Sequence, residues 1–246
     1  MIILGDIGNT ETKICLVNNN DKIIKKIVIP SKGKKLNLLN KYFKKLDFSS
    51  IDKILFCSVV PSTYKELKRY FYNKTKVSCY ELKELNLKKI LKIDVNYKQV
   101  GSDRLANAIS VMQKNKNFII LDFGTATTFD VLTGNNYKGG IISPGIQISL
   151  NTLSDKASLI PKIDLKKITK VIGKDTTSAV RSGFFWGYAG LIDNVVNLIK
   201  KETKKSFNII TTGGFSKLFE DSISTKFKRN NDITINGLIK ASKLIK

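Results

Sequence analysis

The chain contains no histidine, and this absence removes whole classes of chemistry. A Ser-His or Cys-His nucleophile pair cannot be built, so the general bases available near neutral pH are carboxylates. The three cysteines, Cys15, Cys57 and Cys79, lie far apart and form no CxxC pair. That spacing excludes the usual zinc sites and gives no basis for a disulfide framework. We therefore expect buried, reduced cysteines.

Long hydrophobic runs are also missing. The first apolar run, Ile2 to Leu4, is too short for the core of a signal peptide, and no basic segment precedes it. The longest other candidate, residues 183–192, falls well short of a membrane span. We expect a soluble, cytoplasmic protein with no membrane partner. A length of 246 residues with 42% hydrophobic side chains allows one large domain or two smaller ones.

Acidic residues are scarce beside 43 lysines and arginines, and the formal net charge is +23. Such a balance is typical of proteins that bind nucleic acids or anionic membranes. The lysines, however, are scattered through every segment, often as pairs such as Lys25-Lys26 and Lys166-Lys167. They do not interleave with aromatic residues as a nucleic-acid groove requires. We interpret them as solvated faces and expect no nucleic-acid partner, although a basic field attracts small anionic substrates.

Short β-branched runs alternate with stretches of helical spacing, which is typical of an α/β fold. In the first part of the chain we expect strands at 1–4, 13–17, 22–29, 54–58 and 76–80, and helices at 36–46, 63–72 and 102–113. Pro61 and a cap at Ser62 or Thr63 precede the second helix. In the second part we expect strands at 118–121, 129–132, 138–142 and 207–211, and helices at 146–157, 176–202 and 235–244.

An acid-glycine turn occurs twice and is the strongest organisational signal. An apolar run ends in DIGNT at residues 6–10, and a second apolar run ends in DFGTA at residues 122–126. Another strand follows each turn. The repeat predicts a duplicated α/β protein with halves at 1–115 and 116–246 and a cleft between them.

Each turn by itself is explained equally well by a hairpin or by a ligand site. A glycine directly after a strand lets the backbone approach a ligand, and the surrounding N–H groups can form an anion-binding concavity. Aspartates at strand ends can hold a hydrated magnesium ion together with phosphate oxygens. A third turn, at Gly213-Gly214, could let an adenosine lie against the backbone. Together the turns favour a nucleoside triphosphate site, although neither GxxxxGK[ST] nor GxGxxG is present.

These motifs resemble those of the type III pantothenate kinases, in the superfamily of acetate kinases, sugar kinases and actin. The matching stretches are DIGNTETK (6–13), VGSDRLANA (100–108), LDFGTATTFDV (121–131), KGGIISPGIQISL (138–150), GKDTTSAVRSGFFWGYAGLID (173–193), TTGGFSKLF (211–219) and DITINGL (232–238). The resemblance implies a duplicated ribonuclease-H-like, actin-like ATPase fold with two mixed-sheet halves. It also implies a homodimeric transferase that phosphorylates pantothenate with ATP, the first step of coenzyme A biosynthesis.

The resemblance further implies roles for single residues. The ATP-binding residues would be Asp6, Ile7, Gly8, Asn9, Thr10, Glu11, Thr12, Lys13, Thr125, Gly213 and Gly214. The substrate-binding residues would be Gly101, Ser102, Asp103, Arg104, Thr176 and Tyr97, with Asp103 as the proton acceptor. Asp122 would bind a monovalent cation, K⁺ or NH₄⁺, and Asp6 is assigned to Mg²⁺.

Simpler explanations exist for several of these residues. Asp103 could satisfy N–H groups at a helix start, which spacing alone favours. Arg104 could clamp the substrate carboxylate or pair with a neighbouring acid. Thr176 could be a helix cap. Three glycines on the long helix permit close approach of another helix, in the core or at a dimer seam: Gly183, Gly187 and Gly190. Trp186 and Tyr188 are interpreted as core.

Three positions depart from the usual pattern of the family. Ser102 stands where alanine is usual, and Asp94 stands where many members carry a substrate-contacting tyrosine. Tyr97, in place of a common proline, could reach the substrate instead. Two other functions stay open: a regulatory accessory protein on the same fold, and a superfamily kinase for another small hydroxylated substrate.

Overall fold

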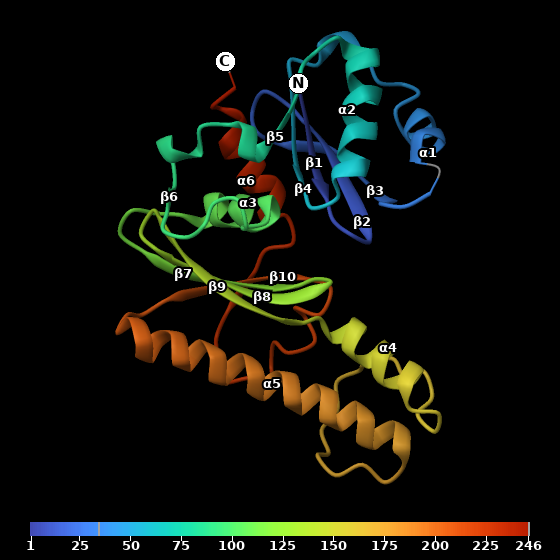
Figure 1. Cartoon of the computed structure of the whole chain (residues 1–246), viewed down its shortest axis with the longest axis vertical. Coiled ribbons are helices and arrows are strands. Elements are labelled where there is room, and N and C mark those ends of the chain that lie inside the picture. Colours follow the sequence, from blue (N-terminus) through green and yellow to red (C-terminus); the bar gives the residue numbers. More distant parts are fainter. Residues whose placement is uncertain (34, 246) are drawn as a thin grey trace. The chain divides into compact units, whose positions relative to one another are not determined.

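The computed structural model describes residues 1–33 and 35–245. The chain separates into two compact units, coloured along the sequence in Figure 1. The first unit comprises Met1–Met112, Asn135–Tyr137 and Asp232–Lys246, and the second comprises Gln113–Gly134 and Lys138–Asn231. The sequence predicted a single boundary at 115/116, whereas here the C-terminal segment groups with the first unit.

The first unit is built on a five-stranded sheet in the order β3-β2-β1-β4-β5. Its strands are β1 (Ile2–Ile7), β2 (Glu11–Val17), β3 (Ile23–Pro30), β4 (Lys53–Ser58) and β5 (Cys79–Glu81). The β1–β2 and β2–β3 pairs are antiparallel, while β1–β4 and β4–β5 are parallel. The parallel register places Asp6 beside Cys57. The ends of β1 and β4 therefore lie next to one another.

Helices of the first unit are α1 (Lys35–Tyr42), α2 (Pro61–Thr75), α3 (Ser102–Val111) and α6 (Ile233–Ser242). Short 3₁₀ turns lie at η1 (Phe48–Ser50), η2 (Leu82–Glu84) and η3 (Leu87–Lys89). The expected Ser62/Thr63 cap is wrong, because α2 begins at Pro61 with Val60 as N-cap. Proline suits the first helical position since it lacks the N–H that would be left without a partner there.

Close packing of α6 on α3 explains why the C-terminal segment joins the first unit. A Cβ atom on Gly237 would lie 1.8 Å from the Ala106 carbonyl oxygen, so only glycine permits this approach. Thr234 also donates a hydrogen bond to the Asn107 side chain, at 2.8 Å. This pairing joins residues far apart in the sequence, and the local pattern gave no sign of it.

The second sheet has the order β11-β10-β7-β8-β9-β6. Its strands are β7 (Asn117–Phe123), β8 (Ala126–Thr133), β9 (Asn136–Pro144), β10 (Asn208–Gly213) and β11 (Lys228–Arg229), and β6 (Lys92–Ile93) pairs with the first residues of β9. β7 pairs antiparallel with β8 and parallel with β10. The first unit repeats this arrangement in β2-β1-β4. The predicted duplicated α/β fold with two mixed sheets is confirmed.

One face of the second sheet packs against α5 (Thr176–Thr203), the long orange helix of Figure 1. Leu121 and Phe129 of the sheet share a buried cluster with Phe185 and Ile192 of the helix. Trp186 and Tyr188 pack against the edge of this cluster, as expected from the sequence. The shorter α4 (Ile146–Lys156) follows β9.

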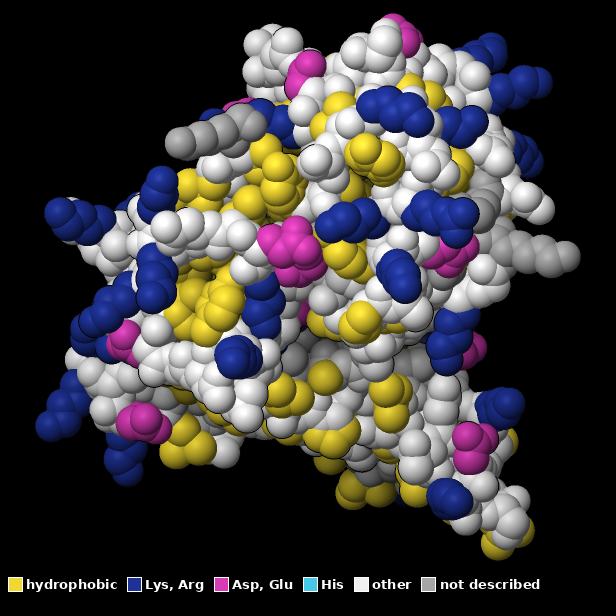
Figure 2. All heavy atoms as spheres, turned by 45° about the horizontal axis from the view of Figure 1, so that its top comes forward, with side chains coloured by type: hydrophobic (Ala, Val, Ile, Leu, Met, Phe, Trp, Pro, Cys, Tyr) yellow, Lys and Arg dark blue, Asp and Glu magenta, His cyan; other side chains and the backbone are white. Residues whose placement is uncertain are grey.

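The charge distribution and the cysteines agree with the composition. Figure 2 shows Lys and Arg side chains spread over the visible face and not gathered in one patch. The three cysteines are buried free thiols. Across residues 1–33 and 35–245, no helix combines the length and apolar character needed to cross a membrane.

Candidate functional site

The first glycine turn connects β1 and β2 and is hydrogen-bonded to the side chain of Ser31. The Gly8 amide donates to the Glu11 carbonyl oxygen at 3.0 Å, and Ser31 Oγ donates to the Gly8 carbonyl oxygen at 2.6 Å. Asn9 and Thr10 are exposed at the tip. Thr12 is fully buried, and its hydroxyl contacts that of Ser31 at 2.8 Å. The structure thus places Thr12 beneath the turn, as a brace.

A pair of half-buried carboxylates, Asp6 and Asp103, lies beside this turn in the first unit. Burial, followed by the negative charge of Asp103, raises the pKa of Asp6 from 3.8 to about 6, against the lowering effect of Lys13. The Cys57 thiol donates to Asp6 Oδ1 at 3.6 Å. Burial also raises the pKa of Asp103, although the Arg104 amide and guanidinium oppose the shift. The like charge of Asp103 thus adds to burial in disfavouring ionisation of Asp6, while burial is the main cause at Asp103.

Asp103 lies in the first turn of α3, and the N-cap is Gly101, which has no side chain to cap with. Asp103 Oδ1 accepts a hydrogen bond from the Arg104 amide at 2.8 Å. A Cβ atom on Gly101 would lie 2.4 Å from Asp103 Oδ1. Because glycine has no Cβ, position 101 leaves room for the Asp103 carboxylate. Two residues of the predicted substrate loop therefore depend on one another.

Ser102, the residue that departs from the family's alanine, ties α3 to the end of β4. Its hydroxyl accepts a hydrogen bond from the Ser58 amide at 2.8 Å and donates one to the Ser58 carbonyl oxygen at 3.1 Å. Glu81 Oε1 accepts from the same amide at 3.3 Å, and burial raises the pKa of Glu81. Sequence reasoning missed Cys57, Ser58 and Glu81 because they reach the site only through strand pairing.

Asp94, at the family's tyrosine position, and Tyr97, its suggested replacement, have different surroundings. Asp94 is exposed and accepts a hydrogen bond from Asn136 Nδ2 at 2.7 Å. Tyr97 is half-buried, and its hydroxyl donates to the Lys83 carbonyl oxygen at 3.0 Å. The contact of Tyr97 with substrate stays a prediction.

The second glycine turn, in the second unit, is closed by a neighbouring loop. The Gly124 amide donates to the Ala126 carbonyl oxygen at 3.1 Å, and a Cβ on Gly124 would lie 3.6 Å from Asp122 Oδ1. A Cβ on Gly145 would meet the Thr125 carbonyl oxygen at 2.1 Å, so the Pro144-Gly145 loop packs directly on this turn. Thr125 itself is exposed. Asp122 therefore ends its strand beside an accessible glycine turn, as Asp6 does.

The third glycine turn follows β10. Gly213 has a φ of +86°, and its Cβ would meet the Phe123 carbonyl oxygen at 2.4 Å, so it is required by the close packing of β10 on β7. A Cβ on Gly214 would meet no atom of the described residues within 4 Å. Of the two predicted adenosine residues, Gly213 thus shapes the strand end and Gly214 leaves open backbone.

Helix α5 resolves two of the alternatives. Its N-cap is Asp175, which accepts from the Ser178 amide at 2.9 Å, so Thr176 is not the cap and lies exposed at the first helical position. The three helix glycines are exposed, and a Cβ on any of them would meet nothing within 4 Å: Gly183, Gly187 and Gly190. Among the residues that the structure describes, the core-packing explanation of these glycines is therefore wrong.

The donor set fits a phosphate-bound cation better than a site made by protein alone. Among the described residues, no three His, Cys, Asp or Glu side chains group as metal ligands. Mg²⁺ in phosphoryl-transfer sites takes one or two carboxylates, with phosphate oxygens and water supplying the rest. The Asp6–Asp103 pair fits such an ion because a cation compensates two half-buried carboxylates.

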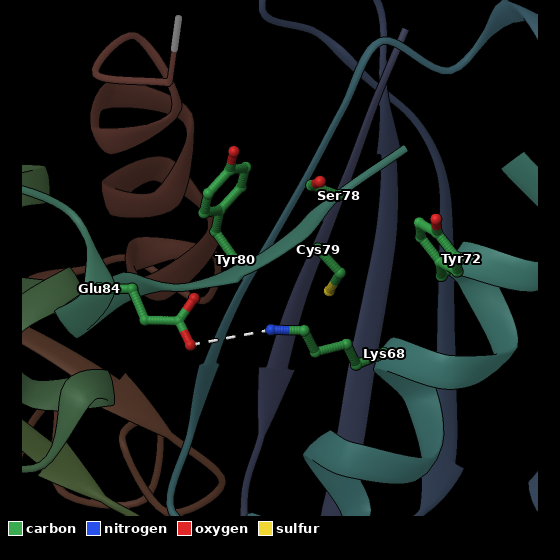
Figure 3. A pocket seen from close by; sticks show the side chains of 6 residues that line it. All are labelled: Lys68, Tyr72, Ser78, Cys79, Tyr80 and Glu84. Carbon is green, nitrogen blue, oxygen red and sulfur yellow. Dashed lines mark ion pairs between the residues drawn. The ribbon is translucent and has the colours of Figure 1, made fainter. Parts of the chain in front are cut away.

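A surface hollow of about 250 Å³ contains none of the predicted site residues. Figure 3 shows that it lies between α2 and the edge strand β5, with Lys68 and Glu84 facing one another across it. The two charged groups are 3.8 Å apart. An exposed ion pair of this kind contributes little to stability.

The family model and the sequence relatives agree on one family. The family model for type III pantothenate kinase matches residues 2–198. The chain is 63% identical to the type III pantothenate kinase of Pelagibacter ubique over the full length of both chains. It is 36% identical to that of a Sulfurihydrogenibium species, over 97% of this chain and 98% of the relative.

Solved structures at low identity show the fold alone. A Campylobacter jejuni protein, named as a candidate Baf family transcriptional activator, has a TM-score of 0.64 at 18% identity, over 98% of this chain and 97% of that one. The inorganic polyphosphate/ATP-glucomannokinase of an Arthrobacter species has a TM-score of 0.51 at 12% identity, over 99% and 97%.

The carboxylate pair predicts a pH-dependent cost to stability. Because the folded-state pKa of Asp6 lies above its ordinary value, the folded state binds this proton more tightly, and the free energy of unfolding falls as pH rises from about 4 to 6. Replacing Asp103 by Asn removes one charge. We expect the metal-free Asp103→Asn variant to melt about 2–4 °C above the unaltered protein at pH 7, with a smaller difference at pH 5. An equal change at both pH values in thermal melts would contradict the repulsion.

Proposed function

Because the chain belongs to the type III pantothenate kinase family, we propose that it transfers the γ-phosphoryl group of ATP to the primary hydroxyl of pantothenate. The product is 4'-phosphopantothenate, and the reaction opens coenzyme A biosynthesis. The observation that carries the proposal is the Asp6–Asp103 pair beside the first glycine turn. It supplies a base for a hydroxyl and a carboxylate for a phosphate-bound cation within one unit.

Asp103 is the proton acceptor in this proposal. A carboxylate within hydrogen-bond reach of the hydroxyl orients it and takes its proton as the phosphoryl group transfers. Burial raises the pKa of Asp103 and so makes it a stronger base than an exposed aspartate. Arg104, next along α3, binds the pantothenate carboxylate. Gly101 and Ser102 complete the loop by fixing the start of the helix.

The first unit also provides phosphate contacts and the divalent cation site. The exposed tip at Asn9 and Thr10, with Lys13 on β2, contacts the phosphates of ATP, and Glu11 belongs to the same ATP-binding turn. Asp6 would hold Mg²⁺, and the bound ion would supply positive charge that offsets the charge of the phosphoryl groups. In the second unit, Thr125 contacts phosphate and Gly214 the adenosine. Asp122 binds a monovalent cation, K⁺ or NH₄⁺.

Two other functions are less well supported. The only support for a regulatory role is the name of the Campylobacter jejuni neighbour. In addition, a protein without catalysis has no need of a destabilising carboxylate pair. A sugar-kinase role is suggested by the similarity to the Arthrobacter enzyme, but at 12% identity this similarity concerns the fold. The 63% identity to a type III pantothenate kinase argues against both.

A substrate panel tests the proposed activity. With ATP, Mg²⁺ and K⁺, we expect the purified protein to form phosphopantothenate from pantothenate and to leave glucose and mannose unreacted, as followed by phosphorus NMR. Phosphorylation of a hexose in preference to pantothenate would favour the sugar-kinase alternative. Steeply salt-dependent DNA binding at micromolar concentration, without turnover of pantothenate, would favour the regulatory one.

Arg104 can be tested through the group it is proposed to bind. We expect Arg104→Met to raise KM for pantothenate about 10- to 100-fold, since a bidentate charge-assisted interaction is lost. The same variant should treat pantothenyl alcohol, which carries CH₂OH in place of the carboxylate, much as the unaltered enzyme does. A similar loss with both substrates in steady-state assays would show that Arg104 acts on the fold and not on the carboxylate.

A homodimer is supported by the exposed face of α5. Uncharged residues recur there at helical spacing: Thr176, Ala179, Gly183, Gly187, Gly190, Asn194 and Asn197. Small side chains at this spacing permit close packing of a second helix. Val171 and Ile172 are 64% and 76% exposed, and Ser182 of α5 donates to the Val171 carbonyl oxygen, so they extend this face as an apolar rim. We assign the face to a second copy of the chain, with Thr176 reaching the neighbour's pantothenate.

A large side chain in the glycine face should separate the subunits. We expect Gly187→Arg to run as a monomer in size-exclusion chromatography with light scattering, because the guanidinium would fill the space of the partner helix. The exposed Glu202→Arg, near the end of α5, is the matched control and should stay dimeric. A dimeric, folded Gly187→Arg would place the interface elsewhere.

A further inference from the structure

We propose that Lys83 is a positioning residue for pantothenate, holding in place the backbone that leads into the substrate loop. This inference rests on the proposed role of residues 101–104. It concerns a side chain on η2 whose position the motifs did not single out. Lys83 and its contacts, Tyr97, Lys98 and Val100, are called the Lys83 clasp below.

Four interactions make the clasp. Lys83 Nζ donates to the carbonyl oxygens of Lys98 at 3.1 Å and of Val100 at 3.0 Å. The ammonium group also lies 5.2 Å from the centre of the Tyr97 ring, a cation–π distance. The Tyr97 hydroxyl returns a hydrogen bond to the Lys83 carbonyl oxygen at 3.0 Å. The segment 97–100 is thus bound from both sides by one residue.

The clasp is itself anchored to the site. The Lys83 amide donates to Glu81 Oε2 at 2.6 Å, while Glu81 Oε1 accepts from the Ser58 amide at the end of β4. Ser58 in turn is bonded to Ser102 at the start of α3. A rigid path therefore leads from the strand that flanks Asp6 to the backbone just before Gly101.

Two separate anchors imply a division of roles. Ser102 bonds directly to Ser58, so α3 and its first-turn Asp103 keep their place without Lys83. The segment 97–100 has exposed residues at Lys98 and Gln99, whose amides donate only to the neighbouring Asn96 among the described bonds, whereas Lys83 ties the segment to η2. Losing Lys83 should therefore loosen the approach to the substrate loop while leaving the proton acceptor in position.

The test separates binding from chemistry. We expect Lys83→Met to raise KM for pantothenate about tenfold, with kcat and KM for ATP within about twofold of the unaltered enzyme. Lys83→Arg should restore most of the loss, because a guanidinium can donate to both carbonyls and stack on Tyr97. Amide hydrogen exchange across residues 97–101 should speed up in Lys83→Met. Exchange does not depend on activity and reports the loop directly.

Controls identify which claim fails if the result differs. Lys88→Met removes an exposed lysine from the neighbouring 3₁₀ turn and should leave KM and exchange unchanged. An unchanged KM for pantothenate in Lys83→Met, or a loss of kcat in parallel with KM, would overturn the inference. If Asp103→Asn in the same assay kept full turnover, the proposed substrate loop would be wrong as well; if it were inactive, only the clasp would be rejected.

Discussion

Parallel pairing of β1 with β4 is the interaction on which the candidate site depends. Its register sets Asp6 beside Cys57 and brings Ser58 to the same end of the sheet. Ser58 then fixes Ser102, and through it the start of α3. Asp103 consequently lies close enough to Asp6 to raise its pKa. One stretch of strand pairing thus controls where two carboxylates meet.

The proximity of the Asp6 and Asp103 carboxylates lowers the stability of the fold and explains several features around them. Burying two acids together is unfavourable when both are ionised, and a folded protein keeps such an arrangement where function requires it. The surroundings restrict movement of the pair: Gly101 leaves room for the Asp103 carboxylate, and Ser31 braces the first turn. The second unit repeats the strand-acid-glycine order, with Gly145 packed on its turn. In both units, a buried strand places an aspartate beside a glycine turn that neighbouring residues hold.

Much of this could be predicted from the sequence because the signals are local. The strand-acid-glycine repeat gave the duplicated fold, and apolar spacing gave α3 and α5 nearly to the residue. Local chemistry also misled: the expected strand at 76–80 begins only at Cys79, because Lys76 takes a left-handed conformation that ends α2. The sequence also did not show that Thr12, a predicted ATP-binding residue, is fully buried.

Features that depend on distant contacts could not be predicted. Membership of α6 in the first unit rests on Gly237 against Ala106, a contact that no periodicity reveals. Cys57 and Glu81 enter the site through strand pairing, and Lys83 through backbone carbonyls that carry no sequence signature. Exposure of the α5 glycines likewise needed the structure, which argues against core packing as the reason for them.

The central claim is that Asp103 takes part in the chemistry of phosphoryl transfer to pantothenate. Its most direct test is a single-turnover measurement on Asp103→Asn, combined with calorimetric titration of pantothenate into the same variant. We expect an affinity within a few-fold of the unaltered enzyme and a rate of transfer lower by about 10²–10⁴-fold. A folded variant that binds pantothenate normally and transfers the phosphoryl group at the unaltered rate would contradict it.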